Sequence, residues 1–240
     1  MNHLNQKGIV VRNVDRAAAE LVSRFAAYGV ATVHEAQQRQ GLLDRRIRPI
    51  QQAKSISGSA VTVLLTPGDN WMFHVAVEQC QPGDVLVVAP TSECHDGFFG
   101  DLLATSLKAR GVVALIGDIG IRDSQTLRDM NFPVWSRAVY AQGTVKETLG
   151  SVNVPLLCAG QLVYPGDIVV ADDDGVVIVP RAHAESINIA AQKRVDIEEN
   201  KRQRLAEGEL GLDIYQMRST LLRKGLRYVD SLEDLEKGSL

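Results

Sequence analysis

The sequence has little of several features that would place a protein in a class at once. Its three cysteines, Cys80, Cys94 and Cys158, are an odd number, lie far apart and form no CxxC pair. This pattern argues against a disulfide framework and against a thiolate zinc site, so we expect reduced and mostly buried thiols. There is no run of basic residues, and the formal net charge is −3. A nucleic-acid partner is therefore disfavoured.

Long apolar runs are also missing. No stretch reaches the roughly 18 apolar residues that would span a bilayer, and the opening MNHLNQKGIVVRNVDR contains no apolar segment of signal-peptide length. We therefore expect a cytoplasmic protein without a membrane partner. The chain of 240 residues is 45% hydrophobic, which is enough to bury a normal core.

The first half of the chain alternates between helical and strand-like patterns. Residues 15–41 have apolar positions at helical spacing, and Gly29 interrupts them, which predicts two successive helices. Strand-like and helix-like segments then follow each other, which indicates an α/β fold. The expected strands are 57–66, 85–89 and 112–118, and the expected helices are 70–80, 101–111 and a short one from Ser124 that ends before Pro133.

After Pro133 the sequence becomes a series of short apolar runs separated by turns, which predicts a β-rich layer. The tripeptide Pro-Gly-Asp begins at Pro67, Pro82 and Pro165, and each copy is typical of a type II turn rather than of a repeated site. The run Asp172-Asp173-Asp174-Gly175 resembles a calcium or magnesium loop in composition. It lies between two strand-like runs and lacks EF-hand spacing, so we interpret it as a hairpin turn.

We expect two parts, a catalytic α/β domain at 1–180 and a helical C-terminal extension at 181–240. The extension is charged and helical for about 45 residues, with interruptions at Gly208 and Gly211. Its apolar positions are sparse, so we expect it to pack on a neighbouring subunit.

The segment GFFGDLLATSLKARGVVALIGDIGIRDSQTL, residues 97–127, contains two loop-to-helix junctions. In the first, a glycine-rich loop leads into a helix that starts at Gly100 to Leu103. The backbone amides of this first turn should be unpaired and should point at an anion. In the second, Arg122 and Asp123 follow a strand. The two junctions end consecutive α/β elements, so they should meet at one edge of the sheet, where α/β folds place ligands.

Helix capping offers a simpler explanation for each acid alone. Asp101 would stabilise the first turn of its helix, and Asp123 could serve as the N-cap of the next one. Capping does not explain why Arg122 lies between them. The joint placement therefore favours a site with one forked cation, two carboxylates and several amides.

The composition of this site argues against covalent catalysis. It lacks an activated Cys or Lys and a Ser-His-Asp set, and Cys94 beside His95 is disfavoured as a nucleophile–base pair because adjacent side chains rarely point at each other. Carboxylates without clustered His suggest Mg²⁺ or Mn²⁺ rather than Zn²⁺. Such an ion beside an arginine suits a 2-oxo acid and would stabilise an enolate as a Lewis acid.

The spacing Gly97-x3-Asp101-x20-Arg122-Asp123 resembles the motif of the 4-hydroxy-4-methyl-2-oxoglutarate/4-carboxy-4-hydroxy-2-oxoadipate aldolases, which are class II, metal-dependent pyruvate aldolases. The resemblance implies a four-layer α-β-β-α arrangement of the swivelling β/β/α type, assembled as a homotrimer or homohexamer with active sites between subunits. Other segments are similar to the same enzymes, and they cover nearly the whole chain: 32–36, 58–84, 132–136, 149–155, 165–177 and 211–218.

A sister branch, the regulators of ribonuclease activity, shares the fold and binds an RNA-degrading endonuclease. That branch lacks the acidic residue after the arginine, whereas this chain has Asp123. The resemblance therefore favours the enzyme, with a non-catalytic regulator as the alternative.

The resemblance also implies roles for individual residues. Asp123 would contact the metal directly, and Asp101, Glu35 and Glu198 would hold it through water, Glu198 coming from a neighbouring subunit. Solvated helix faces are the alternative for the two glutamates. Arg122 would bind the carbonyl side of the substrate and stabilise the enolate. The substrate carboxylate would be held by the amides of Gly100, Asp101, Leu102 and Leu103.

Asn70 and His74 are candidates for contact with the distal part of the substrate. They lie four apart on an expected helix and so share a face, although a capping Asn and a half-buried core His explain them equally well. His95 stands where the relatives have a smaller polar residue, and its role is open.

The implied activity is retro-aldol cleavage. 4-Carboxy-4-hydroxy-2-oxoadipate would give pyruvate and oxaloacetate, and 4-hydroxy-4-methyl-2-oxoglutarate would give two pyruvates. Oxaloacetate decarboxylation would be a side activity because it passes through the same enolate. The family acts at the end of bacterial protocatechuate 4,5-cleavage and gallate degradation.

Overall fold

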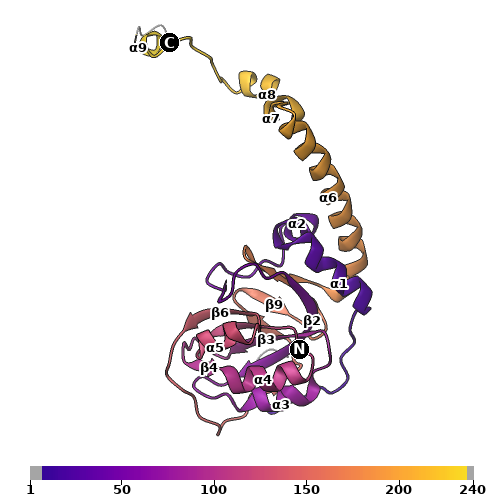
Figure 1. Cartoon of the computed structure of the whole chain (residues 1–240), viewed down its shortest axis with the longest axis vertical. Helices are drawn as coiled ribbons and strands as arrows, with labels where there is room; N and C mark the ends of the chain where they lie inside the picture. Colours follow the sequence, from indigo (N-terminus) through magenta and orange to yellow (C-terminus); the bar gives the residue numbers. More distant parts are fainter. Residues whose placement is uncertain (1–6, 237–240) are drawn as a thin grey trace. The chain divides into compact units, whose positions relative to one another are not determined.

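The computed structural model describes the backbone of residues 7–236. The chain divides into two compact units, Met1–Arg194 and Val195–Leu240, and each is described by itself. Figure 1 traces the elements along the chain.

The first unit contains all the strands that the structure describes. They are β1 (Arg48–Pro49), β2 (Ile56–Leu65), β3 (Asp84–Pro90), β4 (Gly97–Phe99), β5 (Ala114–Ile121), β6 (Val134–Val139), β7 (Ser151–Val152), β8 (Leu156–Cys158), β9 (Gln161–Val163), β10 (Ile168–Asp172) and β11 (Gly175–Val179). Its helices are α1 (Ala19–Tyr28), α2 (Val30–Ala36), α3 (Trp71–Gln79), α4 (Asp101–Ala109), α5 (Ser124–Asp129) and the 3-10 turn Arg181–His183, followed by α6 (Ala184–Ala206), which runs into the second unit.

One large sheet organises this unit, with the strand order β1-β6-β5-β3-β2-β10-β11. Its centre is parallel: β2 pairs with β3, β3 with β5, and β5 with β6. The flanking pairs β1–β6, β2–β10 and β10–β11 are antiparallel. Because α3, α4 and α5 lie between successive strands, the parallel strands end at the same edge, where each helix begins.

Apolar side chains form a core on each face of the sheet. Helices α3, α4 and α5 cover one face, where Phe73, Leu107 and Leu127 pack against inward residues of β2, β3 and β5, and Figure 1 shows α3 and α4 together on this side. The β8–β9 hairpin packs against the other face through residues such as Leu156. A third cluster joins α1 and α2 to β10 and β11. The predicted fold class is confirmed, because the sheet and the helices that pack on it form a mixed α/β fold.

The predicted turns are confirmed. The glycines of the three Pro-Gly-Asp copies, Gly68, Gly83 and Gly166, have φ values of 75°, 88° and 84°, as the third position of a type II turn requires. The acidic run is a hairpin turn, because Asp172 at the end of β10 pairs with Gly175 at the start of β11.

The aspartates of these three turns share a property that the sequence did not reveal: all three are buried. Asp69, Asp84 and Asp167 are 2%, 1% and 6% exposed. Each accepts backbone hydrogen bonds, which offset the cost of burying a charge. Asp84 also accepts two hydrogen bonds from Arg16, at 2.7 Å from Nε and 2.8 Å from Nη2.

The second unit consists of helix α6 from Val195 onward, α7 (Gly211–Ile214), α8 (Arg218–Arg223) and α9 (Leu232–Glu236). The ammonium of Lys201 lies 4.6 Å from the ring centroid of Tyr215. Within the described residues, no helix is long and apolar enough to cross a membrane. Several large apolar side chains of this unit are exposed: Leu205, Leu210, Tyr215, Met217, Leu222, Leu226, Tyr228, Val229 and Leu232.

Replacing Arg16 with Met should destabilise the protein by about 3 kcal/mol, because the buried Asp84 carboxylate would lose its counterion. Urea denaturation at pH 7 measures the change. The matched control is Arg181→Met, because Arg181 forms an exposed pair with Asp15 at 3.5 Å and should contribute less than about 1 kcal/mol. Equal effects of the two substitutions would contradict the assignment.

Candidate functional site

Strand pairing brings the two predicted junctions together. β4 pairs in parallel with β5, with Gly97 opposite Gly120 and Phe99 opposite Ile121. The next residue continues the contact, because the Arg122 amide donates to the Phe99 carbonyl at 2.8 Å. The start of α4 and the start of α5 are therefore neighbours, as the sequence predicted.

Asp123 faces the start of α4 and not its own helix. It has a left-handed backbone, with φ 55° and ψ 33°, and its side chain makes no capping hydrogen bond to α5. Its Oδ2 instead accepts the Asp101 amide at 3.3 Å and lies 3.7 Å from Arg122 Nε. The N-cap explanation for Asp123 is therefore wrong, because its carboxylate is turned toward α4.

The amides at the start of α4 bind carboxylates of the protein itself. The Leu102 amide donates to Asp101 Oδ1 at 2.8 Å, and the Asp101 amide donates to Asp123. These two amides are therefore not unpaired, which differs from the prediction. Their choice of partners agrees with an anion-binding helix start.

Gly100 is required here by close approach. Its backbone is extended, at φ −153° and ψ −167°, so its conformation alone would admit other residues. A Cβ atom on Gly100, however, would lie 2.2 Å from Asp123 Oδ2. Only glycine lets the Asp123 carboxylate reach the first turn of α4.

These residues line a cavity of about 180 Å³, which suits a small acid more than a drug-sized ligand. The predicted residues Asn70 and His74 lie on its wall as well. Asn70 precedes α3 but makes no side-chain cap, and His74 is exposed, so the capping and core alternatives are both wrong. The lining is Asn70, His74, Phe98, Gly100, Asp101, Leu102, Leu103, Arg122, Asp123 and Lys146.

Sequence reasoning missed Lys146. It lies in the loop between β6 and β7, which has no helical or strand-like periodicity, and no motif marks it. Its effect is nevertheless visible at His74. Partial desolvation of its otherwise exposed ring, followed by the positive charge of Lys146, lowers the pKa of His74 below its usual 6.5.

The two glutamates implied to complete the metal shell are not brought to this cavity within the first unit. Glu35 lies on α2 and pairs with Arg39 Nε at 2.9 Å and with Arg194 Nη1 at 3.8 Å. Glu198 lies on α6 in the second unit. Their roles stay predictions. In the described part of the chain, no group of three or more His, Cys, Asp or Glu side chains is arranged to hold a metal.

The cysteines have no nucleophilic setting. Cys80 and Cys158 are buried, and burial raises the pKa of each thiol to about 12. Cys94 is partly buried. Its neighbour His95 lies outside the cavity, with Nε2 3.1 Å from Glu93.

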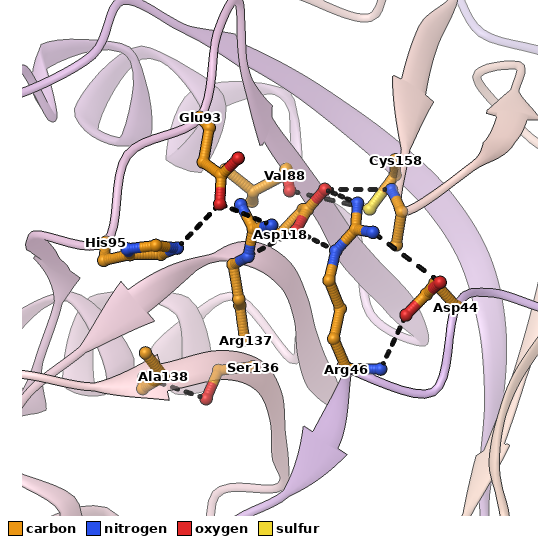
Figure 2. A network of polar contacts seen from close by, with 11 residues as sticks. Asp44, Arg46, Val88, Glu93, His95, Asp118, Ser136, Arg137, Ala138 and Cys158 are labelled. Carbon is orange, nitrogen blue, oxygen red and sulfur yellow. Dashed lines mark hydrogen bonds and ion pairs between the residues drawn. The ribbon is translucent and has the colours of Figure 1, made fainter.

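His95 belongs to a polar network around Asp118 on β5 (Figure 2). Asp118 lies two residues after Ile116 and four after Ala114, so it shares their face of the sheet, the face away from α3 and α4. Arg46 Nη2 lies 2.8 Å and Arg137 Nε 3.7 Å from its carboxylate. Burial alone would raise the pKa of Asp118, but the hydrogen bond from Arg46 and the two positive charges lower it. The network therefore stabilises β5, the strand that precedes Arg122, on the sheet face opposite α3 and α4.

A larger cavity of about 620 Å³ lies beside α2 and the start of α6. Its buried carboxylate, Asp167, has a pKa raised by burial and accepts amides of Tyr164 and Arg181. Neither Arg122 nor the carboxylates beside it line this cavity. The larger cavity is closer to the usual size of a ligand site. The smaller cavity, however, has the arginine and carboxylates that the proposed chemistry requires, so it is the better candidate for the functional site.

The fold and the site together define an α/β protein with an arginine–carboxylate site at the edge of a parallel sheet. A family model described as "RraA-like: Aldolase/RraA" matches residues 30–178. The chain belongs to this RraA-like family, which confirms the resemblance inferred from the sequence.

Individual proteins that are similar to this chain are consistent with the family assignment. A Halalkalibacterium halodurans protein named "Putative 4-hydroxy-4-methyl-2-oxoglutarate aldolase" is 26% identical over 202 residues, covering 84% of this chain and 96% of that protein. The structure of Streptomyces coelicolor RraAS2, described as an unusual member of the RNase ES inhibitor RraA family, is 31% identical with a TM-score of 0.70, covering 79% of this chain and 100% of that one. An uncharacterized Pseudomonas syringae protein shares the fold, with 24% identity, a TM-score of 0.72 and coverage of 82% and 96%.

The Asp118 network predicts a pH-dependent stability. Folding lowers the pKa of Asp118 below its usual 3.8, so the ionised form stabilises the fold above about pH 4 and the stabilisation is lost as the pH falls through the folded-state pKa. Asp118→Asn should cost about 2 kcal/mol at pH 7. The difference from the wild type in urea midpoint should shrink below about pH 4; a constant difference would contradict the prediction.

Proposed function

We propose that this protein is a divalent-metal-dependent pyruvate aldolase, a carbon–carbon lyase. It cleaves 4-hydroxy-4-methyl-2-oxoglutarate to two pyruvates and 4-carboxy-4-hydroxy-2-oxoadipate to pyruvate and oxaloacetate, with oxaloacetate decarboxylation as a side activity. The observation that carries the proposal is the convergence of Arg122, Asp123 and the start of α4 on one small cavity.

The donor set fits Mg²⁺ or Mn²⁺. Asp101 and Asp123 offer carboxylate oxygens, and no histidine or thiolate accompanies them in the first turn of either helix. Mg²⁺ is commonly held by one or two carboxylates together with water and substrate, so the lack of a larger ligand group in the described residues agrees with this ion. When bound, the ion would supply Lewis-acid stabilisation of charge on the substrate carbonyl oxygen.

The residues of the chain bind and orient the substrate. The amides at the start of α4 hold the carboxylate beside the 2-oxo group, which replaces the Asp101 carboxylate at the Leu102 amide. The Arg122 guanidinium donates to the 2-oxo oxygen. When the C4 hydroxyl gives its proton to a water molecule and the C3–C4 bond breaks, C4 becomes the carbonyl carbon of the second product. The electron pair of the broken bond moves onto the 2-oxo oxygen and forms the pyruvate enolate. Arg122 balances this charge, and a proton added at C3 completes pyruvate.

The second unit supports an oligomeric enzyme. It exposes several large apolar side chains, among them Leu205, Met217 and Leu222, which a neighbouring subunit would cover. Packing of residues 181–240 on that neighbour in a trimer or hexamer would bring Glu198 toward a partner's site, where Glu198 and Glu35 would complete the water shell of the metal.

The alternative function is regulation of an endoribonuclease without catalysis, which the likeness to RraAS2 supports. Asp123 favours the enzyme, since its left-handed backbone and its approach to Gly100 serve no capping purpose. A regulator would bind an endoribonuclease and release no pyruvate.

Arg122→Ala and Asp123→Ala should each lower kcat by about 100-fold or more, because each removes a group that stabilises charge in the transition state. A coupled lactate dehydrogenase assay follows pyruvate release with and without Mg²⁺, and EDTA should abolish it. The matched controls are Arg128→Ala and Asp129→Ala, exposed on α5 outside the cavity. Activity that survives EDTA with a borohydride-trapped adduct would instead indicate a Schiff-base lysine.

Gly100→Ala should lower kcat by about 100-fold because the new methyl group displaces the Asp123 carboxylate, and small misplacements at a site are costly. The control is Gly211→Ala, where a Cβ meets nothing closer than 3.8 Å. Steady-state kinetics and urea denaturation are measured together. Full activity of a folded Gly100→Ala protein would show that the Asp123 position is unimportant.

A further inference from the structure

The Arg122 side chain lies against three glycines. A Cβ atom on Gly97 would be 3.3 Å from Arg122 Cβ, and one on Gly100 would be 3.3 Å from Arg122 Cγ. At the far end of the side chain, a Cβ atom on Gly143 would be 3.0 Å from Nη1. The arginine is thus bordered by residues without side chains from its base to its guanidinium.

Two of these glycines are required by other neighbours. A Cβ atom on Gly97 would also lie 2.4 Å from a backbone carbonyl oxygen, and one on Gly100 would lie 2.2 Å from Asp123 Oδ2. Gly143 differs from both. Among the described residues, and apart from its two chain neighbours, the one atom within 4 Å of its added Cβ is Arg122 Nη1. A side chain at this position would therefore act on the guanidinium.

The backbone of Gly143 gives no separate reason for a glycine. Its φ is negative, so it does not adopt the left-handed conformation in which glycine is favoured. Gly143 is also exposed, so burial does not exclude a larger residue. What a larger residue would disturb is the space that Nη1 occupies.

The loop that carries Gly143, between β6 and β7, is anchored on both sides of this residue. Directly before it, the Gln142 carbonyl accepts the Gly97 amide at 2.7 Å. Two residues after it, the Val145 amide donates at 2.9 Å to a carbonyl of the turn before α3. Because the loop is fixed, a methyl group added at Gly143 would displace the guanidinium and not the backbone.

The guanidinium is free to be displaced. The Arg122 side chain is 49% exposed, and its Nε lies 3.7 Å from Asp123 Oδ2, which is longer than a hydrogen bond. A half-exposed arginine with such a distant partner can adopt other rotamers at little cost. The observed orientation therefore depends on the space at Gly143.

We infer that Gly143 is a positioning residue for Arg122. The space left by its missing side chain accommodates Nη1 and keeps Nε on the side of Asp123. Arg122 lines the small cavity, whereas Gly143 is outside its lining, so Gly143 acts through the arginine. This inference rests on the proposed aldolase function, because it concerns the cation that balances the enolate charge.

Gly143→Ala should lower kcat about 10-fold, because a displacement of a few tenths of an ångström misplaces the guanidinium. The urea midpoint should change little, since the residue is exposed. Gly143→Val adds two more methyl groups and should lower kcat further. The matched control is Gln142→Ala, at the neighbouring exposed position outside the cavity lining, which should leave kcat unchanged.

A second background shows whether the effect passes through Arg122. Lysine has no Nη1 atom, so in an Arg122→Lys protein a methyl group at Gly143 meets no guanidinium. Gly143→Ala should then cost less than about 2-fold in kcat, because the two changes are coupled in the wild type. A loss of about 10-fold in both backgrounds would show that Gly143 acts independently of Arg122 and would overturn the inference.

Oxalate binding gives a readout that needs no turnover. Oxalate is a planar dianion with the same pair of oxygens as the pyruvate enolate, and it tests recognition of that species. In calorimetric titrations with Mg²⁺ present, Gly143→Ala should bind oxalate about 10-fold more weakly than the wild type does.

The two measurements separate the two proposals. A wild type that binds oxalate with this dependence on Gly143 but releases no pyruvate would refute the aldolase function and leave the positioning role standing. A wild type that releases pyruvate, together with unchanged kcat and oxalate affinity in Gly143→Ala, would refute the positioning role alone. A wild type that neither binds oxalate nor releases pyruvate would refute both.

Discussion

The site depends first on the parallel pairing of β4 with β5. A three-residue strand, Gly97–Phe99, lies beside the last residues of β5 and makes two helix starts neighbours. The contact is close enough to exclude side chains. A Cβ on Gly120 would lie 1.9 Å from the His95 carbonyl oxygen, and one on Gly97 would lie 2.4 Å from the Tyr140 carbonyl oxygen. Gly120 is therefore needed so that β5 can approach the segment before β4, and Gly97 is needed so that β4 can approach the segment after β6. These approaches determine where Arg122 and the start of α4 meet.

The pairing also explains why an unfavourable backbone is tolerated at Asp123. A left-handed conformation is costly for most residues and is least costly for Asn and Asp. The chain accepts it because the Arg122 amide is held by Phe99 and the Tyr140 amide is held by Ile121, which leaves little freedom to the segment between β5 and α5. The strained residue is thereby turned toward Gly100. Strain at a position that an ordered scaffold maintains is typical of functional sites.

The sequence predicted the parts of this arrangement that depend on local patterns. Periodicity located β2, β3, β5 and the helices between them, and the positions of Asp101 and Arg122 after loop and strand indicated their convergence. Features that depend on long-range contacts could not be predicted from the sequence. Lys146 lies in a loop without periodicity, and its place in the cavity follows from hydrogen bonds to Asp69, a residue 77 positions earlier in the chain. The ion pairs of Glu35 with Arg39 and Arg194 were not predictable either, because Arg39 lies beyond the end of α2 with a left-handed backbone and Arg194 lies on the distant helix α6.

The three Pro-Gly-Asp turns make long-range contacts that their local sequence signature does not indicate. Each was correctly read as a turn, yet each aspartate is buried and ties its turn to a distant segment. Asp84 accepts a hydrogen bond from the Arg16 side chain, which precedes α1. Asp167 accepts the Arg181 amide, which precedes α6. Asp69 accepts an amide of the β6–β7 loop, which lines the cavity. A buried carboxylate is stable only while its donors stay in place, so each turn makes a distant segment part of the folding unit. At Asp69 that segment forms a wall of the site, and the geometry of the site is therefore maintained by the same interaction that stabilises the fold.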